Sequence, residues 1–580
     1  MKNREIAEIF NEIAAMLSVE GTATSRFEVR AYQTAALNIA GLQEDVAAIY
    51  ARGGVEALME IPGIGKGIAG HIEEYLKTGR IRKYNMLKKK YPIDFTALMK
   101  VQGIGAKKCV ILYRKLGVRN VDGLRKAVST HKVRELEGFG ERSEEALARG
   151  LSIAESAGGR MLLGAVLPEA ESMIAGLSKC TLVKKALIAG SVRRMRETVG
   201  DLDILVLADD GPKVMDMFEK MEGVERTIIK GPTKTTVQLG LGIMCDLRVL
   251  SPDSFGAAVQ YFTGSKAHNI AVRKIAMAKG YKLNEYGLFD GKGRLVSSRD
   301  EPDIYGKLGM QWMPPEMRED RGEIKLAQAH KVPKLVELQD LKGDLHTHTK
   351  ETDGQNSLEE MAEAAIMAGL DYIATTNHTK SLKVAKGMDE KAFAKYFGEV
   401  DRLNKKYDGR FTILKGAEVD ILKDGSLDLD AKTLKGMDCA LGAVHTSFNM
   451  PGKAMTARVV RAIESGLIRV LAHPTGRVIN LREPYQIDMG RIAEAAAANN
   501  VILEIDSFPD RLDLNDTNIM IAAKRKTMFS IDSDAHNITH YANLRYGVGT
   551  ARRGWLPSSR IANSMPVDRL MKILGRGFEG

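Results

Sequence analysis

Histidines and acids at the ends of apolar runs constrain this chain more than any other feature. In the C-terminal part, short apolar runs end successively in GDLHTHT, TTNHT, GAEVD, GAVHTS, LAHPTG, LEIDS and IDSDAH. Six of the chain's 11 histidines stand at these ends, with acids beside them. The nine candidate residues are His346, His348, Asp353, His378, Glu418, His445, His473, Asp534 and His536. Because the strands of a (β/α) barrel gather their C-terminal ends at one face, we expect these side chains to converge.

A converging set of imidazoles and carboxylates is typical of a metal centre. A lone histidine after a strand is more often structural, but six histidines with three acids favour metal binding. Mixed nitrogen and oxygen ligands suit Zn²⁺, Mn²⁺ or Fe²⁺, and the residue types do not choose among these ions.

The length and composition of the chain limit its class. Its 580 residues predict several domains, since single domains usually hold roughly 100–200 residues. Hydrophobic residues make up 44% and charged residues 27%, which excludes a largely disordered or membrane-spanning chain. The N-terminus carries charges where a signal peptide needs apolar residues. The four cysteines are far apart and form no C-x-x-C pair, as is usual for reduced thiols. We therefore expect a cytoplasmic protein without membrane contact.

The first 150 residues predict helices joined by glycine turns, and they carry much of the net charge of +11. IPGIGKGIAGHIEEYL (61–76) and VQGIGAKKCVILY (101–113) place a Gly-x-Gly turn before an amphipathic helix, and LEGFGERSEEAL (136–147), with Arg142, is a looser copy. Such a turn presents backbone N–H groups to a phosphate. Three copies in a basic helical region resemble helix-hairpin-helix motifs, which bind nucleic-acid backbones. The candidate DNA contacts are Gly63, Gly65, Lys66, Gly103, Gly105, Lys107 and Lys108.

Three aspartates on strand-like runs form a second candidate site. Asp201 and Asp203 lie two apart, so both side chains project from one face of a strand, and Asp246 lies in another strand-like run. Converging carboxylates repel each other unless cations lie between them, and two Mg²⁺ or Mn²⁺ ions would suit such a site. The Gly190-Ser191 turn upstream, followed by Arg193, Arg194 and Arg196, is suited to a triphosphate.

This glycine-serine turn with its three aspartates resembles the nucleotidyltransferase superfamily. The run YFTGSKAHNIAVRKIAMAKGYKLNEYGLF (261–289) resembles the thumb of family X DNA polymerases. The resemblance implies that Asp201, Asp203 and Asp246 are catalytic metal ligands, with Asp246 accepting the proton of the primer hydroxyl. It implies nucleotide contacts from Gly190, Ser191, Arg194, Gly200, Tyr261, Phe262, Gly264, Lys266, Asn269 and Arg273.

Two positions depart from the family pattern. Met195 stands where a glycine often follows the paired arginines. His71 stands at the position of the Schiff-base lysine of family members that excise deoxyribose phosphate, and Gly67 at the nearby lysine position. Because an imidazole cannot form the imine, the resemblance leaves lyase activity open, with Lys66 as a poorly placed substitute amine.

The C-terminal pattern resembles the PHP (polymerase and histidinol phosphatase) domain, a distorted seven-stranded barrel with a trinuclear metal centre. The D-x-H-x-H opening, the middle Glu418 and the closing D-x-H are all present. Intact ligands imply an active phosphoesterase holding three ions of Mn²⁺, Zn²⁺ or Fe²⁺, although some relatives keep the fold as a structural element.

The order of these regions resembles bacterial and archaeal PolX proteins, a multidomain α/β class. The expected bounds are 1–90 for an N-terminal helical domain, 91–155 for fingers with further hairpins, 156–250 for a palm, 251–315 for a thumb, 316–340 for a linker and 341–580 for the PHP barrel. The resemblance implies a monomeric, nucleoid-associated repair polymerase that fills short gaps on gapped or primer–template DNA with dNTPs. Its PHP domain would be a 3′–5′ exonuclease, with abasic-site cleavage or 3′-phosphate removal as further activities.

Three alternatives stay open on the sequence alone. A non-templated nucleotidyltransferase would share the aspartates but would not need Tyr261, Asn269 or Arg273. A PHP phosphatase of small metabolites would carry a degenerate polymerase core. A DNA-binding scaffold would keep both metal sites for structure only.

Overall fold

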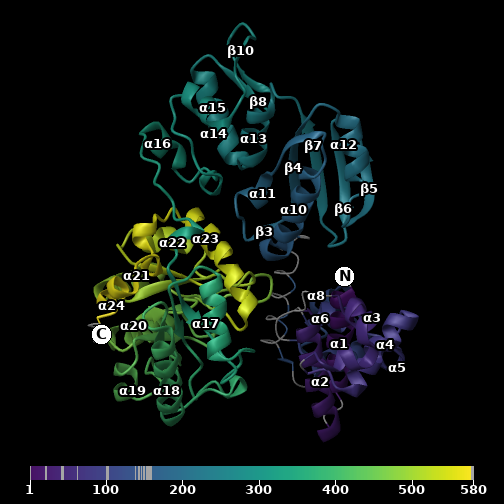
Figure 1. Ribbon diagram of the computed structural model, residues 1–580, viewed down its shortest axis with the longest axis vertical. Coiled ribbons are helices and arrows are strands. Elements are labelled where there is room, and N and C mark those ends of the chain that lie inside the picture. The colour runs from purple at the N-terminus through teal and green to yellow at the C-terminus, as the bar shows by residue number, and fades with distance from the viewer. Residues whose placement is uncertain are drawn as a thin grey trace. The chain divides into compact units, whose positions relative to one another are not determined.

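The structure is a computed structural model (Figure 1). It describes residues 2–575 apart from 20–21, 41–44, 62, 100–103, 137–138, 141–143, 145–146, 148–150 and 152–159. The chain forms two compact units, one within residues 1–158 and one comprising 159–479 and 483–580. Within the described ranges, every helix is too short or too polar to cross a membrane.

The first unit is helical, as the sequence predicts. Among its described residues, the helices are α1 (Lys2–Ser18), α2 (Ala23–Ala40), α3 (Val46–Met59), α4 (Lys66–Thr78), α5 (Arg82–Lys90), α6 (Phe95–Met99), α7 (Ala106–Leu116) and α8 (Val121–Ser129). They share one hydrophobic core, in which Phe10, Ile13 and Phe95 are fully buried. Because Ile6, Phe10 and Ile13 are spaced three or four residues apart, they lie on one face of α1 and hold it in this core.

A five-stranded sheet, here called the palm, opens the second unit. The strand order is β2 (Val183–Ile188), β4 (Asp201–Ala208), β7 (Met244–Leu250), β6 (Lys234–Leu239) and β5 (Val224–Lys230). Only β4 and β7 are parallel. Helices α10 (Leu163–Ser178) and α12 (Gly211–Phe218) share a hydrophobic cluster with one face of this sheet, and α11 (Gly190–Arg193) follows β2. The short strands β1 (Met161–Leu162) and β3 (Thr198–Val199) pair beside it.

The thumb follows the palm. It contains α13 (Phe255–Thr263), α14 (Lys266–Ala278), the antiparallel strands β8 (Lys282–Asn284), β9 (Gly287–Phe289) and β10 (Leu295–Ser297), and α15 (Glu301–Lys307). Residues 316–340, expected as a linker, include part of η1 (Pro315–Met317), α16 (Glu323–Gln328) and η2 (Leu338–Asp340). Arg318 and Glu323 are fully buried in this segment, so it packs as an ordered connection.

The barrel consists of seven parallel strands arranged in chain order. They are β11 (Gly343–Thr347), β12 (Tyr372–Thr375), β13 (Thr412–Asp420), β14 (Cys439–Ala443), β15 (Val470–Leu471), β16 (Ile502–Asp506) and β17 (Phe529–Asp532). A bridge between Thr347 and Ala535 joins the end of the first strand to the segment after the last. Strands buried on both faces need apolar side chains throughout, which explains the continuous apolar runs in the sequence.

Helices surround this barrel (Figure 1). They are α17 (Leu358–Met367), α18 (Glu390–Tyr407), α19 (Ala431–Lys435), α20 (Gly452–Glu464), α21 (Met489–Ala498), α22 (Asp516–Ala523), α23 (Leu544–Arg553) and α24 (Val567–Ile573). Short 3₁₀ turns are η3 (Lys383–Ala385), η4 (Ile538–Asn543), η5 (Ser558–Arg560) and η6 (Ala562–Ser564). The expected seven-stranded barrel is confirmed.

A buried ion cluster fastens the palm to the thumb. Glu301, at the start of α15, accepts hydrogen bonds from Arg193 at 3.0 and 2.9 Å, and it also pairs with the fully buried Arg318. Burial alone would raise the pKa of Glu301, but the two guanidinium groups outweigh it and lower the pKa to about 2. The carboxylate is therefore charged at every physiological pH.

We expect Glu301→Gln to destabilise the second unit by about 3 kcal/mol, because it leaves two buried guanidinium groups without their anion. The pKa of Glu301 is lower in the folded state, so its contribution is present above pH 4.5 and is lost as the pH falls toward 2. Calorimetric unfolding at neutral and acidic pH measures both effects. Asp209→Asn, which breaks the exposed pair with Lys184, is the control and should leave the unfolding temperature unchanged. Equal unfolding temperatures for Glu301→Gln and wild type at neutral pH would contradict this account.

Candidate active sites of the palm and the barrel

The parallel pairing of β4 with β7 brings the three palm aspartates together. Asp203 lies directly opposite Asp246 in this register, and Asp201 lies two residues before Asp203 on the same face of β4. Leu205, next on that face, packs against Phe255 and Val259 of α13, so the aspartates face the thumb helix. Burial and the charges of Asp201 and Asp246 raise the pKa of Asp203 to about 6. A cation between these carboxylates would relieve this repulsion.

Two residues of β6 hold Asp246 in place, and neither was predicted from the sequence. The Thr236 hydroxyl donates to one carboxylate oxygen of Asp246 at 2.6 Å. The Lys234 ammonium lies 2.7 Å from the other oxygen. Both contacts depend on the pairing of β6 with β7, which no local motif encodes.

The glycine-serine turn lies directly over Asp203. Gly190 adopts a φ of +61°, and a Cβ there would stand 2.2 Å from a carboxylate oxygen of Asp203, so only glycine fits. The Ser191 hydroxyl next to it is buried and has no hydrogen-bond partner among the described residues. A buried hydroxyl without a partner can donate to an anionic ligand. The three neighbouring carboxylates would repel such a ligand unless cations lie between them and it. Gly200 directly precedes Asp201. A Cβ at Gly200 would stand 3.3 Å from the Arg160 guanidinium.

The predicted nucleotide contacts of the thumb form one cluster. The Asn269 amide donates to the carbonyls of Tyr261 at 2.6 Å and Gly264 at 3.2 Å, and the Arg273 guanidinium lies 5.9 Å from the Tyr261 ring centre. Phe262 packs edge-on against Tyr261, and Lys266 is exposed at the start of α14. 

Arg194 joins this thumb segment to the palm turn. It donates to the Thr263 carbonyl at 2.8 Å and pairs with Glu319 at 3.0 Å.

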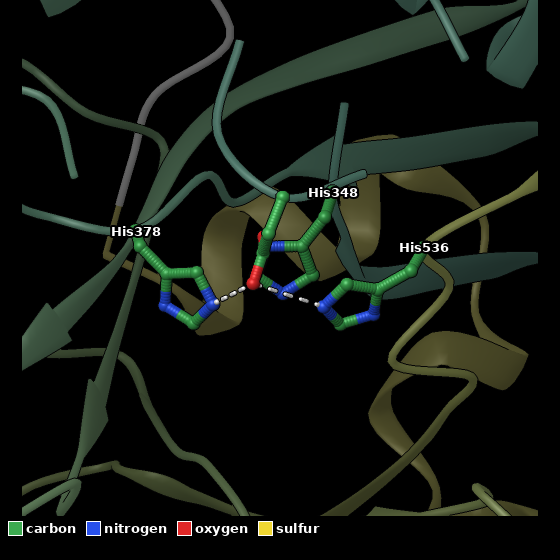
Figure 2. Close-up of side chains that lie close together, drawn as sticks. His348, His378 and His536 are labelled. Carbon is green, nitrogen blue, oxygen red and sulfur yellow. Dashed lines mark ion pairs between the residues drawn. The ribbon is translucent and has the colours of Figure 1, made fainter. Parts of the chain in front are cut away.

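In the barrel, three imidazoles surround one carboxylate (Figure 2). The side chain of Asp353 lies 3.1 Å from His378 Nε2, 3.5 Å from His536 Nε2 and 3.6 Å from His348 Nδ1. Their ligand atoms all lie within 4.8 Å of one another, close enough to hold one ion.

Two further groups share residues with the first. His346, His348 and Asp534 form one, with Asp534 Oδ1 lying 3.2 Å from His348 Nε2. His378, Glu418 and His445 form the other, and Glu418 also lies 2.7 Å from His473 Nε2. All nine residues predicted from the sequence therefore converge at one end of the barrel.

The chemistry of this cluster fits divalent metal ions. His346 Nε2, both ring nitrogens of His348, and His378 Nδ1 are buried and make no well-aligned hydrogen bond, although carboxylates lie close to them. Burial and the charges of His536 and His378 lower the pKa of His348 to about 3, which leaves its imidazole neutral and able to ligate. The neighbouring carboxylates instead raise the pKa values of the imidazoles of His346, His378, His445 and His536, so a bound metal ion would replace the protons that these rings carry.

Acids outside the predicted set orient the histidines. Glu504 of β16 lies 2.6 Å from His346 Nδ1, and its other oxygen accepts the His473 backbone N–H at 2.5 Å. Asp420 lies 3.0 Å from His445 Nδ1. Such contacts fix the ring orientation of a ligating histidine. Both acids stand in the strand-end motifs GAEVD and LEIDS, but those motifs do not say which acid faces a metal and which faces a ring.

The glycine turns of the first unit have the expected form where they are described. Gly65 and Gly105 precede α4 and α7 as N-cap residues, and Lys66 and Lys107 are exposed beside them. Gly63 has a φ of +75°, and a Cβ there would stand 2.6 Å from Thr34. 

The remaining predicted DNA contacts are Lys108 and Gly103, with Arg142 in the looser third turn. Lys108 lies 5.2 Å from the Phe139 ring centre, whereas Gly103 and Arg142 lie outside the described residues. His71 stacks on Tyr32, in line with a structural histidine at this position.

Four known family descriptions match separate parts of the chain. The descriptions that match are a helix-hairpin-helix domain over residues 1–81, a SAM-like helix-hairpin-helix tandem over 95–152, a DNA polymerase beta thumb over 258–319 and a PHP domain over 344–507.

Three relatives match the chain over different lengths. "DNA polymerase/3′-5′ exonuclease PolX" of Bacillus subtilis is 34% identical over 579 residues, which covers 99% of this chain and 100% of the relative. DNA polymerase lambda of Arabidopsis thaliana is 25% identical over 46% of this chain and 54% of its own length. A probable phosphatase of Thermoanaerobacter is 29% identical over 33% of this chain and 78% of its own length.

The fold and the two sites together define a family X polymerase core followed by a PHP domain. With a full-length relative at 34% identity, the chain belongs to the PolX family.

We expect Glu418→Gln to lower the divalent metal content of the purified protein by at least one ion per chain, because Glu418 lies within 4 Å of five imidazoles. Elemental analysis after dialysis measures this content. Glu494→Gln, an exposed acid of α21, is the control and should retain the wild-type content. Equal metal content in Glu418→Gln and wild type would contradict the assignment.

Proposed function

We propose that this protein is a template-directed DNA polymerase that fills short gaps in DNA repair and resects 3′ ends with its barrel. The observation that carries the polymerase part is the alignment of Asp203 with Asp246 on parallel strands beneath the Gly190-Ser191 turn. The full-length relative named as a DNA polymerase/3′-5′ exonuclease supports both parts. Gap filling is supported by the partial likeness to DNA polymerase lambda.

In the palm, the chain's own residues position the nucleotide and the primer end. Asp201, Asp203 and Asp246 would hold two Mg²⁺ or Mn²⁺ ions, which supply charge neutralisation and activation of the primer hydroxyl when bound. Ser191 and Arg194 would bind the triphosphate, and Asp246 would accept the hydroxyl proton. Lys234 and Thr236 hold the Asp246 carboxylate in one orientation, which reduces the reorganisation needed for the reaction.

In the thumb, a rigid cluster would contact the nascent base pair. Tyr261 and Phe262 would pack on the incoming sugar, and Asn269 and Arg273 would contact minor-groove edges. The hydrogen bonds of Asn269 to two backbone carbonyls support this role, because they hold the segment in one conformation. A non-templated transferase has no use for such a cluster.

In the barrel, the nine converging residues would hold three ions of Mn²⁺, Zn²⁺ or Fe²⁺, which supply Lewis acidity toward a phosphate when bound. Glu504 and Asp420 orient the imidazoles for this task. The complete ligand set supports an active phosphoesterase over a structural scaffold. The likeness to a probable phosphatase favours removal of 3′ phosphates as a second activity of this site.

The first unit would bind the DNA backbone through the turns at Gly63–Lys66 and Gly105–Lys108. Exposed lysines beside helix N-termini support this role, since both features attract phosphates. Lyase activity is not proposed, because His71 offers no primary amine.

Two single variants are expected to separate the two activities. On a gapped duplex with dNTPs and Mn²⁺, Asp246→Ala should lower the rate of primer extension at least 100-fold and leave the rate of 3′ resection intact. The reason is that this variant removes a ligand of the palm site only. His346→Ala should do the reverse. Gel analysis of primer length measures both rates. Loss of both activities in either variant, with the fold intact, would contradict separate sites.

Incorporation should also depend on the template base. With wild-type protein and single dNTPs, we expect the complementary nucleotide to be preferred at all four template bases. Equal incorporation of all four would support a non-templated transferase instead.

A further inference from the structure

One arginine reaches the metal-ligand cluster of the barrel. Arg511 lies between β16 and α22, and its Nε stands 3.5 Å from Asp506 Oδ2 and 3.7 Å from Asp534 Oδ2. Asp534 belongs to the candidate metal ligands, whereas Asp506 ends β16. Within the described ranges, Arg511 is the only lysine or arginine that pairs within 4 Å with Asp353, Glu418 or Asp534.

The contacts of Arg511 are not those of a purely structural arginine. Both distances exceed hydrogen-bonding range, and its guanidinium makes no hydrogen bond to any described residue. By contrast, the buried Arg458 donates to the carbonyls of Leu422, Thr446 and Ile421. The side chain of Arg511 is 25% exposed, while those of Asp506 and Asp534 are 0% and 8% exposed. Its donors therefore remain available to a ligand that enters from solvent.

The loop that carries Arg511 is held in place before any ligand arrives. The backbone N–H groups of Arg511 and Leu512 both donate to the Phe508 carbonyl, at 2.8 and 3.1 Å. Phe508 packs edge-on against His540. On the other side, Leu512 is buried in the hydrophobic cluster of the palm. 

Pro509 of the same loop packs on the palm helix α10. A Cβ at Gly164 of this helix would stand 2.3 Å from Pro509. The palm thus fixes the loop from outside while Arg511 points toward the barrel cluster.

A fixed guanidinium with unused donors beside a metal centre suits a phosphate. Its planar fork matches two phosphate oxygens, and its charge persists at every working pH. We propose that Arg511 binds the non-bridging oxygens of the scissile phosphodiester at a DNA 3′ end and stabilises the charge that develops there. This inference rests on the proposed function of the barrel. 

In the reaction, the oxygen of water bonds to phosphorus and the bond from phosphorus to the penultimate O3′ breaks. A deoxynucleoside monophosphate leaves, the new 3′ oxygen takes up a proton, and the proton of water passes to solvent. Arg511 stays protonated throughout.

Full-length Arg511→Met and Arg511→Lys, loaded with Mn²⁺, test this role. We expect Arg511→Met to lower kcat/KM for removal of a 3′ nucleotide by about 100-fold, as is typical when one preorganised donor is lost. Arg511→Lys should recover only part of this loss, because an ammonium cannot bind two oxygens as a fork. Arg525→Met, which removes a guanidinium paired through Nε with Glu494, is the matched control and should retain wild-type kinetics.

Two further readouts distinguish phosphate binding from support of the metal ligands. Arg511→Met should keep the wild-type Mn²⁺ content, and it should lose the rise in Tm that inorganic phosphate gives to the Mn²⁺-loaded wild type. Loss of Mn²⁺, or an unchanged phosphate-induced rise in Tm, would overturn the proposal. If wild type resects no DNA, the proposed function of the barrel fails, but the phosphate-induced rise in Tm still decides the role of Arg511.

Discussion

Close packing of carboxylate and imidazole side chains, imposed by the strand geometry, is the constraint on which both sites depend. In the palm, strand register sets Asp203 opposite Asp246, and this proximity contributes to raising the pKa of Asp203. In the barrel, six imidazoles and three carboxylates meet, and several ring nitrogens make no hydrogen bond. Divalent cations would offset the carboxylate charges in the palm and replace the imidazole protons in the barrel. Both arrangements become favourable when divalent cations occupy the space between the ligands, so each pocket is preorganised for metal-dependent phosphate chemistry.

Much of this could be predicted from the sequence, because the decisive signals are local. The D-x-D spacing places two carboxylates on one strand face, and the strand-end histidines of a parallel barrel meet at one edge by geometry. The contacts that sequence reasoning missed are all long-range. Lys234 reaches Asp246 only through the register of β6 with β7, and Glu504 reaches His346 across the barrel. A linker is expected over residues 316–340 because the stretch 314–340 carries three prolines and many charges, yet Arg318 lies buried against Glu301.

Within the second unit, polar side chains connect the palm and the segment after the thumb with the barrel. Arg553 of α23 donates to the Arg194 carbonyl at 2.9 Å and to Glu319 at 3.0 Å, and Glu319 also pairs with the Arg194 side chain. Arg477 of the barrel pairs with Glu197, four residues before Asp201. Each site is thus supported partly by residues from the other domain. This shared support gives a physical reason for keeping extension and resection in one chain.

Crystals grown with Mn²⁺, gapped DNA and an incoming nucleotide, measured at the manganese absorption edge, test the central claim most directly. The account predicts anomalous peaks between Asp201, Asp203 and Asp246, and further peaks among the nine barrel ligands. Manganese bound only elsewhere, with both pockets empty of anomalous signal, would contradict it.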